Sequence, residues 1–349
     1  MNPMIKFNIL VFGIFTIIIS GCSRDPIIDP NTPIHFTTHA AYIVSDGTSS
    51  TQAGLSLYDF RTGSYNMNIF TPGTPVPFAN DIVVSGSNLF MISTGNLGDG
   101  MVYLLDSAGN VLNSVSLGSA PSGIAVASGK LYVSTAFDSS VTVLNTGTLS
   151  FIKKIKAGYF PEKLIGYSDK VFACNTRTLG GLTDNRVTVI DAAADSVIKQ
   201  IRVSPYPSSV ILSNDKKIIV GCKSTLNAVM YKIDPISLSV IDSLILPNGF
   251  VSDMSLNSVT NEIFFIQDVN HIGLADFVSR NILTVITVNE PGASITGYAY
   301  DAESAKHCIG ASFSITVNGK FYLYSSTGIL EKSFDTFANP SKIAIKNIF

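Results

Sequence analysis

The stretch that decides the fold is PSGIAVASGKLYVSTAFDSSVTVLNTGTLSFIKKIKAG, which runs from Pro121 to Gly158. It holds four strand-like runs, rich in β-branched and aromatic residues, with Gly, Ser, Asn and Asp between them. The runs begin at Pro121, Lys130, Val141 and Phe151. The third run, VTVLN, predicts a strand with two distinct faces. The fourth, FIKKIKAG, predicts a charged outer edge that discourages pairing with another sheet.

One phrase inside this stretch recurs along the whole chain: an apolar strand, then Asp, Asn or Ser, then small polar residues. It occurs seven times, at Asp59, Asp106, Asn145, Asp191, Asp234, Asp276 and Ser325. The spacings between these residues range from 39 to 49. Repeats of about 40–50 residues with strand-like alternation are typical of β-propellers, in which each blade has four strands. The chain is therefore predicted to be all-β, a seven-bladed β-propeller with four-stranded antiparallel blades.

Bulk composition favours the same fold class and narrows the function. Hydrophobic residues make up 46% of the 349 residues and charged residues only 14%. Turn-forming residues are abundant and long helix-forming runs are absent, which favours an all-β chain. The formal net charge is −2 at pH 7, and the basic residues form no cluster. Because binding to nucleic-acid phosphates needs clustered Lys and Arg, no nucleic-acid partner is predicted.

The two ends of the repeat array fit together only if they belong to one blade. Seven runs have the pattern of a second strand, and the first of them is AAYIVSD at Ala40–Asp46. Seven runs have the pattern of an inner strand only when PSKIAI, Pro340–Ile345, is included. We therefore expect the C-terminal strand to pair with the N-terminal blade and close the ring, leaving no open blade edge. The alternative is an open solenoid with a spare strand.

The N-terminal segment has the pattern of an export signal. Lys6 precedes the apolar run FNILVFGIFTIII, whose 13 residues are fewer than the roughly 20 that a membrane span needs. Small residues follow the run. This order is typical of a secretory signal peptide, which we predict over residues 1–21. The alternative is a short apolar helix that stays attached as an anchor.

The residues Ile19-Ser20-Gly21-Cys22 resemble the lipobox of bacterial lipoproteins. The resemblance implies cleavage before Cys22 and acylation of Cys22, with several acyl chains giving a stable membrane anchor. Residues 22–37, rich in Pro and Asp, are then predicted to form a flexible tether, and residues 38–349 the propeller. The expected location is the cell envelope, on the outer membrane of a Gram-negative bacterium.

Two stretches, Leu131–Leu149 and Asn185–Val220, resemble the YVTN-type propeller repeat, and the resemblance extends over residues 38–349. It implies the fold and leaves the function open, because propellers carry many unrelated sites. In anchor, length and blade type the chain is also similar to Bacteroidota surface lipoproteins that capture cobalamin. That resemblance implies a non-enzymatic protein that binds a large small-molecule ligand and passes it to a TonB-dependent transporter.

Aromatic residues gather directly before the predicted inner strands. Five of them would lie on the top face of the ring: Phe78, Tyr159, Phe160, Tyr206 and Phe250. In this blade order, the loops before the inner strands and those between second and third strands share that face. The rings are predicted to form an aromatic collar around the channel mouth, suited to a flat or amphipathic ligand or to a partner protein. The alternative is that they wedge between neighbouring blades.

The longest predicted top loops supply polar candidates for the same binding face. These loops are Thr94–Gly100, Thr176–Asn185 and Gln267–His271. Irregular long loops on a regular scaffold commonly carry function. The candidates are Asp99, Arg177, Asp184, Asp268 and His271. The alternative is that these side chains are solvated or stabilise turns.

The sequence predicts no catalytic residue, no metal ligand and no cofactor. The three cysteines of the propeller, Cys174, Cys222 and Cys308, lack zinc-site spacing and are predicted to be small buried hydrophobic residues. His35 and His39 have H-x-x-x-H spacing, but in an extended chain they lie roughly 13 Å apart, too far to share one metal. Two other functions stay open: a lactonase-like hydrolase with a cation on the propeller axis, and a structural scaffold of an envelope complex.

Overall fold

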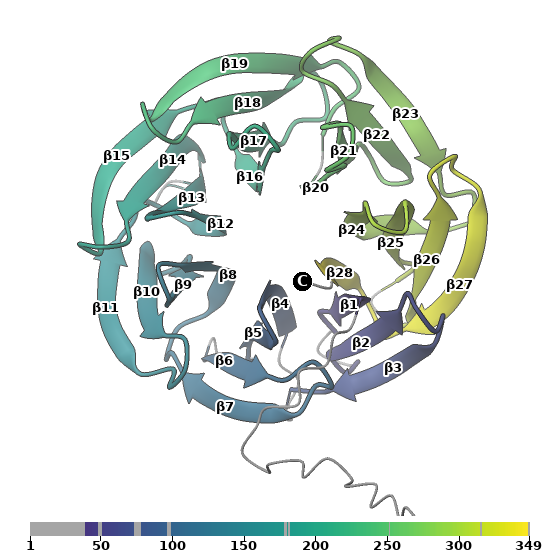
Figure 1. Ribbon diagram of the computed structural model, residues 1–349, viewed down its shortest axis with the longest axis horizontal. Helices are drawn as coiled ribbons and strands as arrows, with labels where there is room; N and C mark the ends of the chain where they lie inside the picture. Colours follow the sequence, from purple (N-terminus) through teal and green to yellow (C-terminus); the bar gives the residue numbers. More distant parts are fainter. Residues whose placement is uncertain are drawn as a thin grey trace, which may run out of the picture. The chain divides into compact units, whose positions relative to one another are not determined.

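The four strand-like runs of Pro121–Gly158 form one antiparallel sheet, as predicted. In the computed structural model they are β8 (Pro121–Ala127), β9 (Lys130–Thr135), β10 (Ser140–Asn145) and β11 (Phe151–Lys156). Hydrogen bonds join these strands in chain order, and β8 lies nearest the centre of the ring (Figure 1). This sheet is blade 3, and six more four-stranded sheets complete a ring of seven.

Blade 3 lies between blades 2 and 4, and blade 1 lies on the other side of blade 2 (Figure 1). Blade 1 holds β28 (Pro340–Lys346), β1 (Ala40–Ser45), β2 (Gly54–Asp59) and β3 (Tyr65–Phe70). Blade 2 holds β4 (Phe78–Ser85), β5 (Asn88–Thr94), β6 (Gly100–Leu105) and β7 (Val111–Ser116). Blade 4 holds β12 (Pro161–Tyr167), β13 (Lys170–Arg177), β14 (Thr183–Asp191) and β15 (Ser196–Arg202).

Blades 5, 6 and 7 complete the ring. Blade 5 holds β16 (Pro207–Leu212), β17 (Ile218–Cys222), β18 (Ala228–Asp234) and β19 (Ser239–Leu246). Blade 6 holds β20 (Ser252–Leu256), β21 (Ile263–Ile266), β22 (His271–Ala275) and β23 (Ile282–Thr287). Blade 7 holds β24 (Ser294–Asp301), β25 (Lys306–Ser312), β26 (Gly319–Ser325) and β27 (Leu330–Thr336).

The structure describes residues 39–47, 51–72, 78–95, 99–177, 180, 182–250, 252–314 and 316–347. The predicted signal peptide, the lipid attachment residue Cys22 and the tether lie outside these residues. Within the described ranges, no helix is long and apolar enough to cross a membrane.

The ring closes through blade 1, which combines the two ends of the propeller. β28 pairs with β1 in antiparallel register, with Ala40 opposite Lys346 and Tyr42 opposite Ala344. Two backbone hydrogen bonds extend the joint, from Asp46 N to Asn339 O at 3.0 Å and from Gly47 N to Ala338 O at 3.1 Å. The predicted closure by the C-terminal strand is therefore confirmed, and the last strand is the innermost strand of the first blade.

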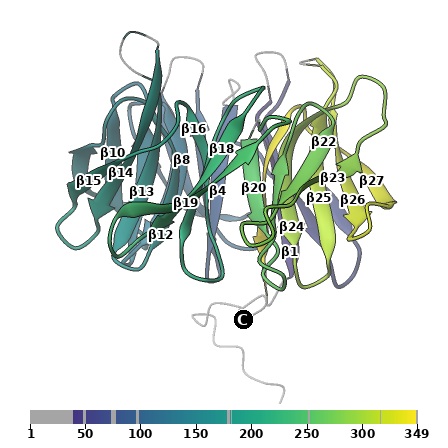
Figure 2. The same cartoon turned by 90° about the horizontal axis from the view of Figure 1, so that it is seen from above.

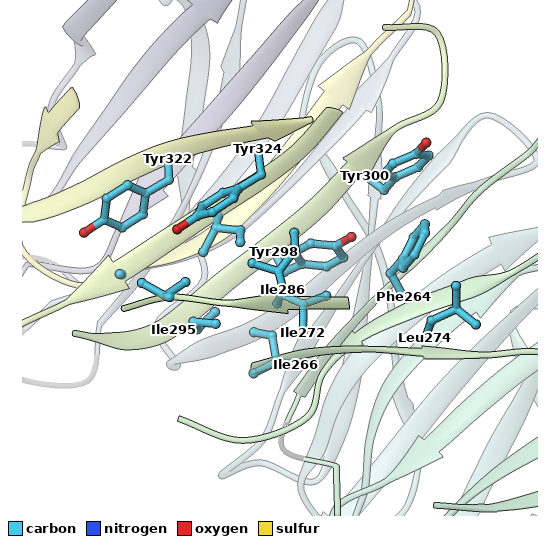
Figure 3. Packing of buried hydrophobic residues seen from close by; sticks show 13 residues of the cluster. Phe264, Ile266, Ile272, Leu274, Ile286, Ile295, Tyr298, Tyr300, Tyr322 and Tyr324 are labelled. Atoms are coloured by element: carbon cyan, nitrogen blue, oxygen red, sulfur yellow. The ribbon is translucent and has the colours of Figure 1, made fainter. Parts of the chain in front are cut away.

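The prediction of two distinct faces for the third strand is wrong. Every residue of β10 except Asn145 is buried, including Thr142. The reason is that each blade is covered on both faces by its neighbours, so the middle strands lose the alternation that a half-exposed sheet would show. Figure 3 shows such an interface, where Phe264, Ile272, Tyr298 and Tyr322 belong to one buried cluster formed by blades 6 and 7.

The recurrence of Asp or Asn after the third strand of blades 1 to 6 has a local cause. In blade 4, Asp191 Oδ1 accepts hydrogen bonds from the backbone N–H groups of Ala193 at 2.9 Å and Ala194 at 2.8 Å. Asn145 accepts the equivalent pair in blade 3. Such side-chain-to-backbone bonds fix the tight turn into the outer strand. The repeated phrase in the sequence is therefore a turn signal.

The three cysteines are buried and unpaired, which confirms their predicted role as packing residues. Cys174 and Cys308 are fully enclosed and Cys222 nearly so. Burial raises the pKa of all three thiols, to about 12 for Cys222. Thiols held in the neutral form inside the blades are chemically inert.

Candidate functional site

The propeller has two faces, and each face holds a different set of connections between strands. The top face holds the connections from second to third strands and from each outer strand to the next inner strand, and the bottom face holds the other turns (Figure 2). β1 begins at Ala40 beside Lys346 of β28, so the propeller begins and ends on the bottom face. The predicted collar and the three long loops belong to the top face.

One collar residue, Phe250, packs inside the propeller. Its side chain is fully buried and its ring centroid lies 5.9 Å from that of Phe265. The ring rests on the backbone of Gly221 in the neighbouring blade, where an added Cβ would lie 2.5 Å from the ring. Phe250 therefore wedges between blades 5 and 6 and does not line the channel mouth.

Phe160 and Tyr206 are held at the surface by an unusual backbone. Their φ angles are 45° and 63°, and each stands directly before the proline that opens an inner strand. Positive φ is unfavourable for a bulky residue and persists only where other contacts hold it. Thr176 N donates to Phe160 O at 3.1 Å, and Lys223 N donates to Tyr206 O at 2.8 Å. These bonds tie each top connection to the end of the second strand in the same blade.

An open cleft of about 630 Å³ lies on the top face where blades 3 and 4 meet, and it is the blade 3–4 cleft below. Its lining comprises Phe137, Asp138, Ser139, Lys154, Lys156, Gly158 and Tyr159. Phe137 is 75% exposed, and its ring meets that of Phe160 edge to face at 5.7 Å. Two aromatic residues from consecutive top connections therefore line the cleft, and Phe160 packs against one of them.

The polar side of the blade 3–4 cleft has an excess of positive charge. Lys154 Nζ lies 2.6 Å from Asp138 Oδ2, and Lys156 Nζ donates to the backbone oxygen of Asp138 at 3.0 Å. The hydrogen bond from Lys154 lowers the pKa of Asp138, so the carboxylate is ionised at neutral pH. Two ammonium groups face one carboxylate, next to exposed aromatic surface. This combination suits a flat or amphipathic ligand that carries an acidic group.

Arg177 and Tyr206 form a second polar–aromatic pair, at the top of blades 4 and 5. A hydrogen bond to the Tyr206 side chain raises the pKa of Arg177, which is itself exposed. Lys223 Nζ lies 5.8 Å from the centroid of the Tyr206 ring, within reach of a cation–π contact. These predicted residues therefore do contact each other.

Asp184 has a structural role and lies in β14, because that strand begins at Thr183 and shortens the loop predicted over Thr176–Asn185. Its side chain is 2% exposed and accepts hydrogen bonds from Arg186 Nε at 2.9 Å and Arg186 Nη2 at 2.7 Å. Its backbone oxygen accepts a bond from Tyr206 N at 2.7 Å. Asp184 thus orients Arg186 and supports the connection that carries Tyr206.

The remaining predicted residues lie in blades 2 and 6. Phe78 is half-buried at the start of β4, and Asp99 is exposed in the loop before β6. Asp268 Oδ1 accepts from the backbone N–H of His271 at 3.0 Å and lies 2.8 Å from its Nδ1 atom. Asp268 and His271 therefore stabilise their own turn.

The propeller axis carries two ion pairs that sequence reasoning missed. Lys163 Nζ lies 3.3 Å from Asp81 Oδ2, and Lys342 Nζ lies 3.2 Å from Asp253 Oδ1. Each pair joins inner strands that are two blades apart in the ring: β12 to β4 and β28 to β20. The signal was present in the sequence, because each of these charges is the third residue of its predicted inner strand, in ANDIVV, PEKLIG, VSDMSL and PSKIAI.

The axial carboxylates are paired with lysines and not with each other. Among the described residues, no group of three or more His, Cys, Asp or Glu side chains is arranged to hold a metal ion. His39, from the H-x-x-x-H spacing, lies 2.9 Å from Asp301 Oδ2 through its Nε2 atom, while His35 lies outside the described residues. The candidate site is the blade 3–4 cleft, and Arg177 and Tyr206 form a second polar–aromatic pair at the top of blades 4 and 5.

The fold is shared with solved structures of varied function. Kuenenia stuttgartiensis hydrazine synthase matches with 18% identity and a TM-score of 0.64, over 80% of this chain and 95% of that chain. A quinonprotein alcohol dehydrogenase-like protein from Bacteroides thetaiotaomicron matches with 15% identity and a TM-score of 0.70, over 88% of this chain and 78% of that chain. Likenesses at this identity show the fold alone. No protein-family model and no curated protein matches the sequence.

Proposed function

We propose that this chain is a non-enzymatic lipoprotein of the bacterial cell envelope that binds a ligand in the blade 3–4 cleft. The observation that carries the proposal is Phe137, a large apolar ring that is 75% exposed at the lip of a cleft with two lysines. An exposed aromatic ring beside a concave basic surface is a typical anchor for recognition. The rings of Tyr159 and Phe160, predicted from the sequence, complete the same surface.

The lipobox-like pattern at Cys22 supports the anchor, and the resemblance to cobalamin-capturing surface lipoproteins supports the partner. A lipid on Cys22 attaches the protein to the outer membrane, and the ligand is passed to a TonB-dependent transporter. Cobalamin is the specific candidate, because it is a large amphipathic molecule with a flat ring system and a phosphate group. A ring system of this kind can stack on Phe137, and a phosphate can pair with Lys154 or Lys156.

Calorimetry with cyanocobalamin tests the proposal on the full-length protein in detergent micelles. We expect binding by the wild type and a loss of affinity of roughly 10- to 30-fold in Phe137→Ala, as for the removal of a central aromatic contact. The control is Leu226→Ala, because Leu226 is 71% exposed in a top connection of blade 5. If the wild-type protein releases no heat with cobalamins, the proposal that cobalamin is the ligand is wrong. If Phe137→Ala binds with the same affinity as the wild type, the blade 3–4 cleft is not the binding site.

A further inference from the structure

Three branched aliphatic side chains project into solvent from the bottom face of two adjacent blades. Ile236 and Val278 are each 87% exposed, and Val259 is 79% exposed. Ile236 lies in the turn between β18 and β19 of blade 5, while Val259 and Val278 lie in two turns of blade 6. These residues are the aliphatic tips below.

The turns hold the aliphatic tips outward by a shared mechanism. In each turn an Asp or Asn side chain accepts the backbone N–H of the residue two positions later, which is the tip itself. The bonds run from Ile236 N to Asp234 Oδ1 at 3.3 Å, from Val259 N to Asn257 Oδ1 at 3.0 Å and from Val278 N to Asp276 Oδ1 at 2.9 Å. Because the backbone is fixed by the side chain before it, the tip residue is free of any packing role.

Equivalent turns between the third and outer strands of other blades show that the fold does not require an aliphatic residue at the positions of Ile236 and Val278. The same hydrogen bond to the residue two positions later is made by Arg61, Ala108, Gly147 and Ala193 in blades 1 to 4. A charged, a small and a glycine residue all serve the turn equally well. Large apolar side chains at these positions therefore need an explanation outside folding.

The aliphatic tips lie on two neighbouring blades that are joined at their bottom turns. Asn214 Nδ2 donates to Ser258 O at 2.6 Å, and Arg280 Nη2 lies 2.8 Å from Asp242 Oδ1 across the same interface. The acidic groups beside the tips are already bound. Asp234 pairs with Lys217 at 3.0 Å, and Asp276 accepts the hydroxyl hydrogen of Ser279 at 2.5 Å. Both carboxylates are therefore engaged within their turns, and the aliphatic side chains project into solvent beside them.

We infer that the aliphatic tips dock the propeller onto the lipid bilayer to which Cys22 anchors it. The inference rests on the lipid anchor of the proposed function. The bottom face is the end where the propeller begins, at His39, and 16 residues separate Cys22 from it. Fully extended, this length spans about 60 Å, so the tether joins the bottom face to the membrane without fixing the orientation of the propeller. Aliphatic side chains with polar Ser and Thr neighbours can insert into the boundary between headgroups and acyl chains.

Docking through blades 5 and 6 fixes the orientation of the whole propeller. The top face, with the blade 3–4 cleft, then points away from the bilayer and is open to ligand. A tether alone would leave the propeller free to tumble, so the aliphatic tips supply the orientation that the tether lacks.

The chain has no tryptophan, so a single introduced indole reports its own contact with lipid. Three full-length variants are reconstituted in vesicles of phosphatidylethanolamine and phosphatidylglycerol, with or without dibrominated phosphatidylcholine as a quencher. Val278→Trp places the probe at an aliphatic tip. Ala193→Trp places it at the equivalent turn position of blade 4, and Leu226→Trp places it on the top face. Vesicle flotation is measured in parallel to report the anchor.

We expect all three variants to float with the vesicles, with bromine quenching strong for Val278→Trp, weak for Ala193→Trp and absent for Leu226→Trp. A probe inserted by about 5–10 Å should lose at least about half of its fluorescence. Floating protein in which Val278→Trp is quenched no more than Ala193→Trp overturns the docking and leaves the anchor intact. Full-length protein that does not float overturns the anchor, and the docking with it.

Discussion

Phe160 and Phe250 stand at the same place in the repeat, directly before an inner strand, and the fold uses them in opposite ways. Phe250 is fully buried between blades 5 and 6, whereas Phe160 lies at the surface against the exposed ring of Phe137. The difference lies in the neighbouring blade. Gly221 pairs with Ser209 at the register where blade 3 pairs Ser134 with Gly123. A glycine there leaves room for a ring, and a serine side chain fills it.

The comparison teaches that the same sequence signal can produce either a packing residue or a binding residue. An aromatic residue before an inner strand becomes internal where the adjacent second strand offers a glycine. It stays available to a ligand where that strand carries a side chain. At the top face, the blade 5–6 boundary therefore encloses its aromatic residue, whereas the blade 3–4 boundary leaves its aromatic residue accessible above a buried core.

We expect the largest loss of stability when the buried ring of Phe250 is removed. Phe250→Ala should lower the free energy of unfolding by about 3–5 kcal/mol, because it leaves a cavity between two blades. Phe160→Ala should lower it by roughly 1 kcal/mol or less, since the ring is only half-buried. Urea unfolding of both variants measures the difference. Equal losses would contradict the contrast between the two boundaries.

The second prediction concerns Gly221, the glycine that leaves room for the ring of Phe250. Gly221→Ala should destabilise the protein by about 1–3 kcal/mol, because the added Cβ would lie 2.5 Å from the Phe250 ring. The matched control is Gly180→Ala, since a Cβ there meets nothing within 4 Å. Thermal unfolding of the two variants measures the effect. If both melt like the wild type, Gly221 does not create the site for Phe250.

A third boundary, the closing blade, places Asn339 at the position of Phe160 and Phe250. Asn339 Nδ2 donates to Asp46 Oδ2 at 2.8 Å, and Ser341 also donates to this carboxylate. Burial raises the pKa of Asp46 to about 7. Because the pKa is higher in the folded than in the unfolded protein, protonation of Asp46 stabilises the fold. That stability is complete below about pH 4 and is lost as the pH rises through 7.

Asp46→Asn should therefore abolish the loss of stability that ionisation of Asp46 causes as the pH rises. Relative to the variant, the wild type should lose about 2–3 kcal/mol of stability between pH 5 and pH 8. Urea unfolding of both proteins at the two pH values gives this difference, and contributions from other titrating groups cancel in the comparison. A constant difference across the range would show that the folded-state pKa of Asp46 is not raised.

The fold could be predicted from the sequence because its determinants are local. Seven turn signals and seven strand patterns specify seven blades, and the C-terminal run PSKIAI is explained only by ring closure. The burial of VTVLN could not be derived from its own alternation, because the second covering face belongs to another blade. Each blade is specified by nearby residues, while burial depends on neighbours distant in the chain.

The candidate site was predicted only in part for the same reason. Tyr159 and Phe160 carried a positional signal, because they precede an inner strand. Phe137, Lys154 and Lys156 carried none, since they reach the cleft only when the second-to-third-strand connection and the outer strand of blade 3 fold beside it. A large aromatic residue inside the polar turn AFDSS was the one available hint.

Hydrogen–deuterium exchange of the full-length protein, with and without cyanocobalamin, tests the central claim most directly. The claim is that ligand binds at the blade 3–4 boundary and not at the blade 5–6 boundary. We predict ligand-induced protection in the peptides that contain Phe137–Ser139 and Gly158–Phe160, with no change in the peptide that contains Phe250. Protection at Phe250, or bound ligand without protection at the blade 3–4 cleft, would contradict the account.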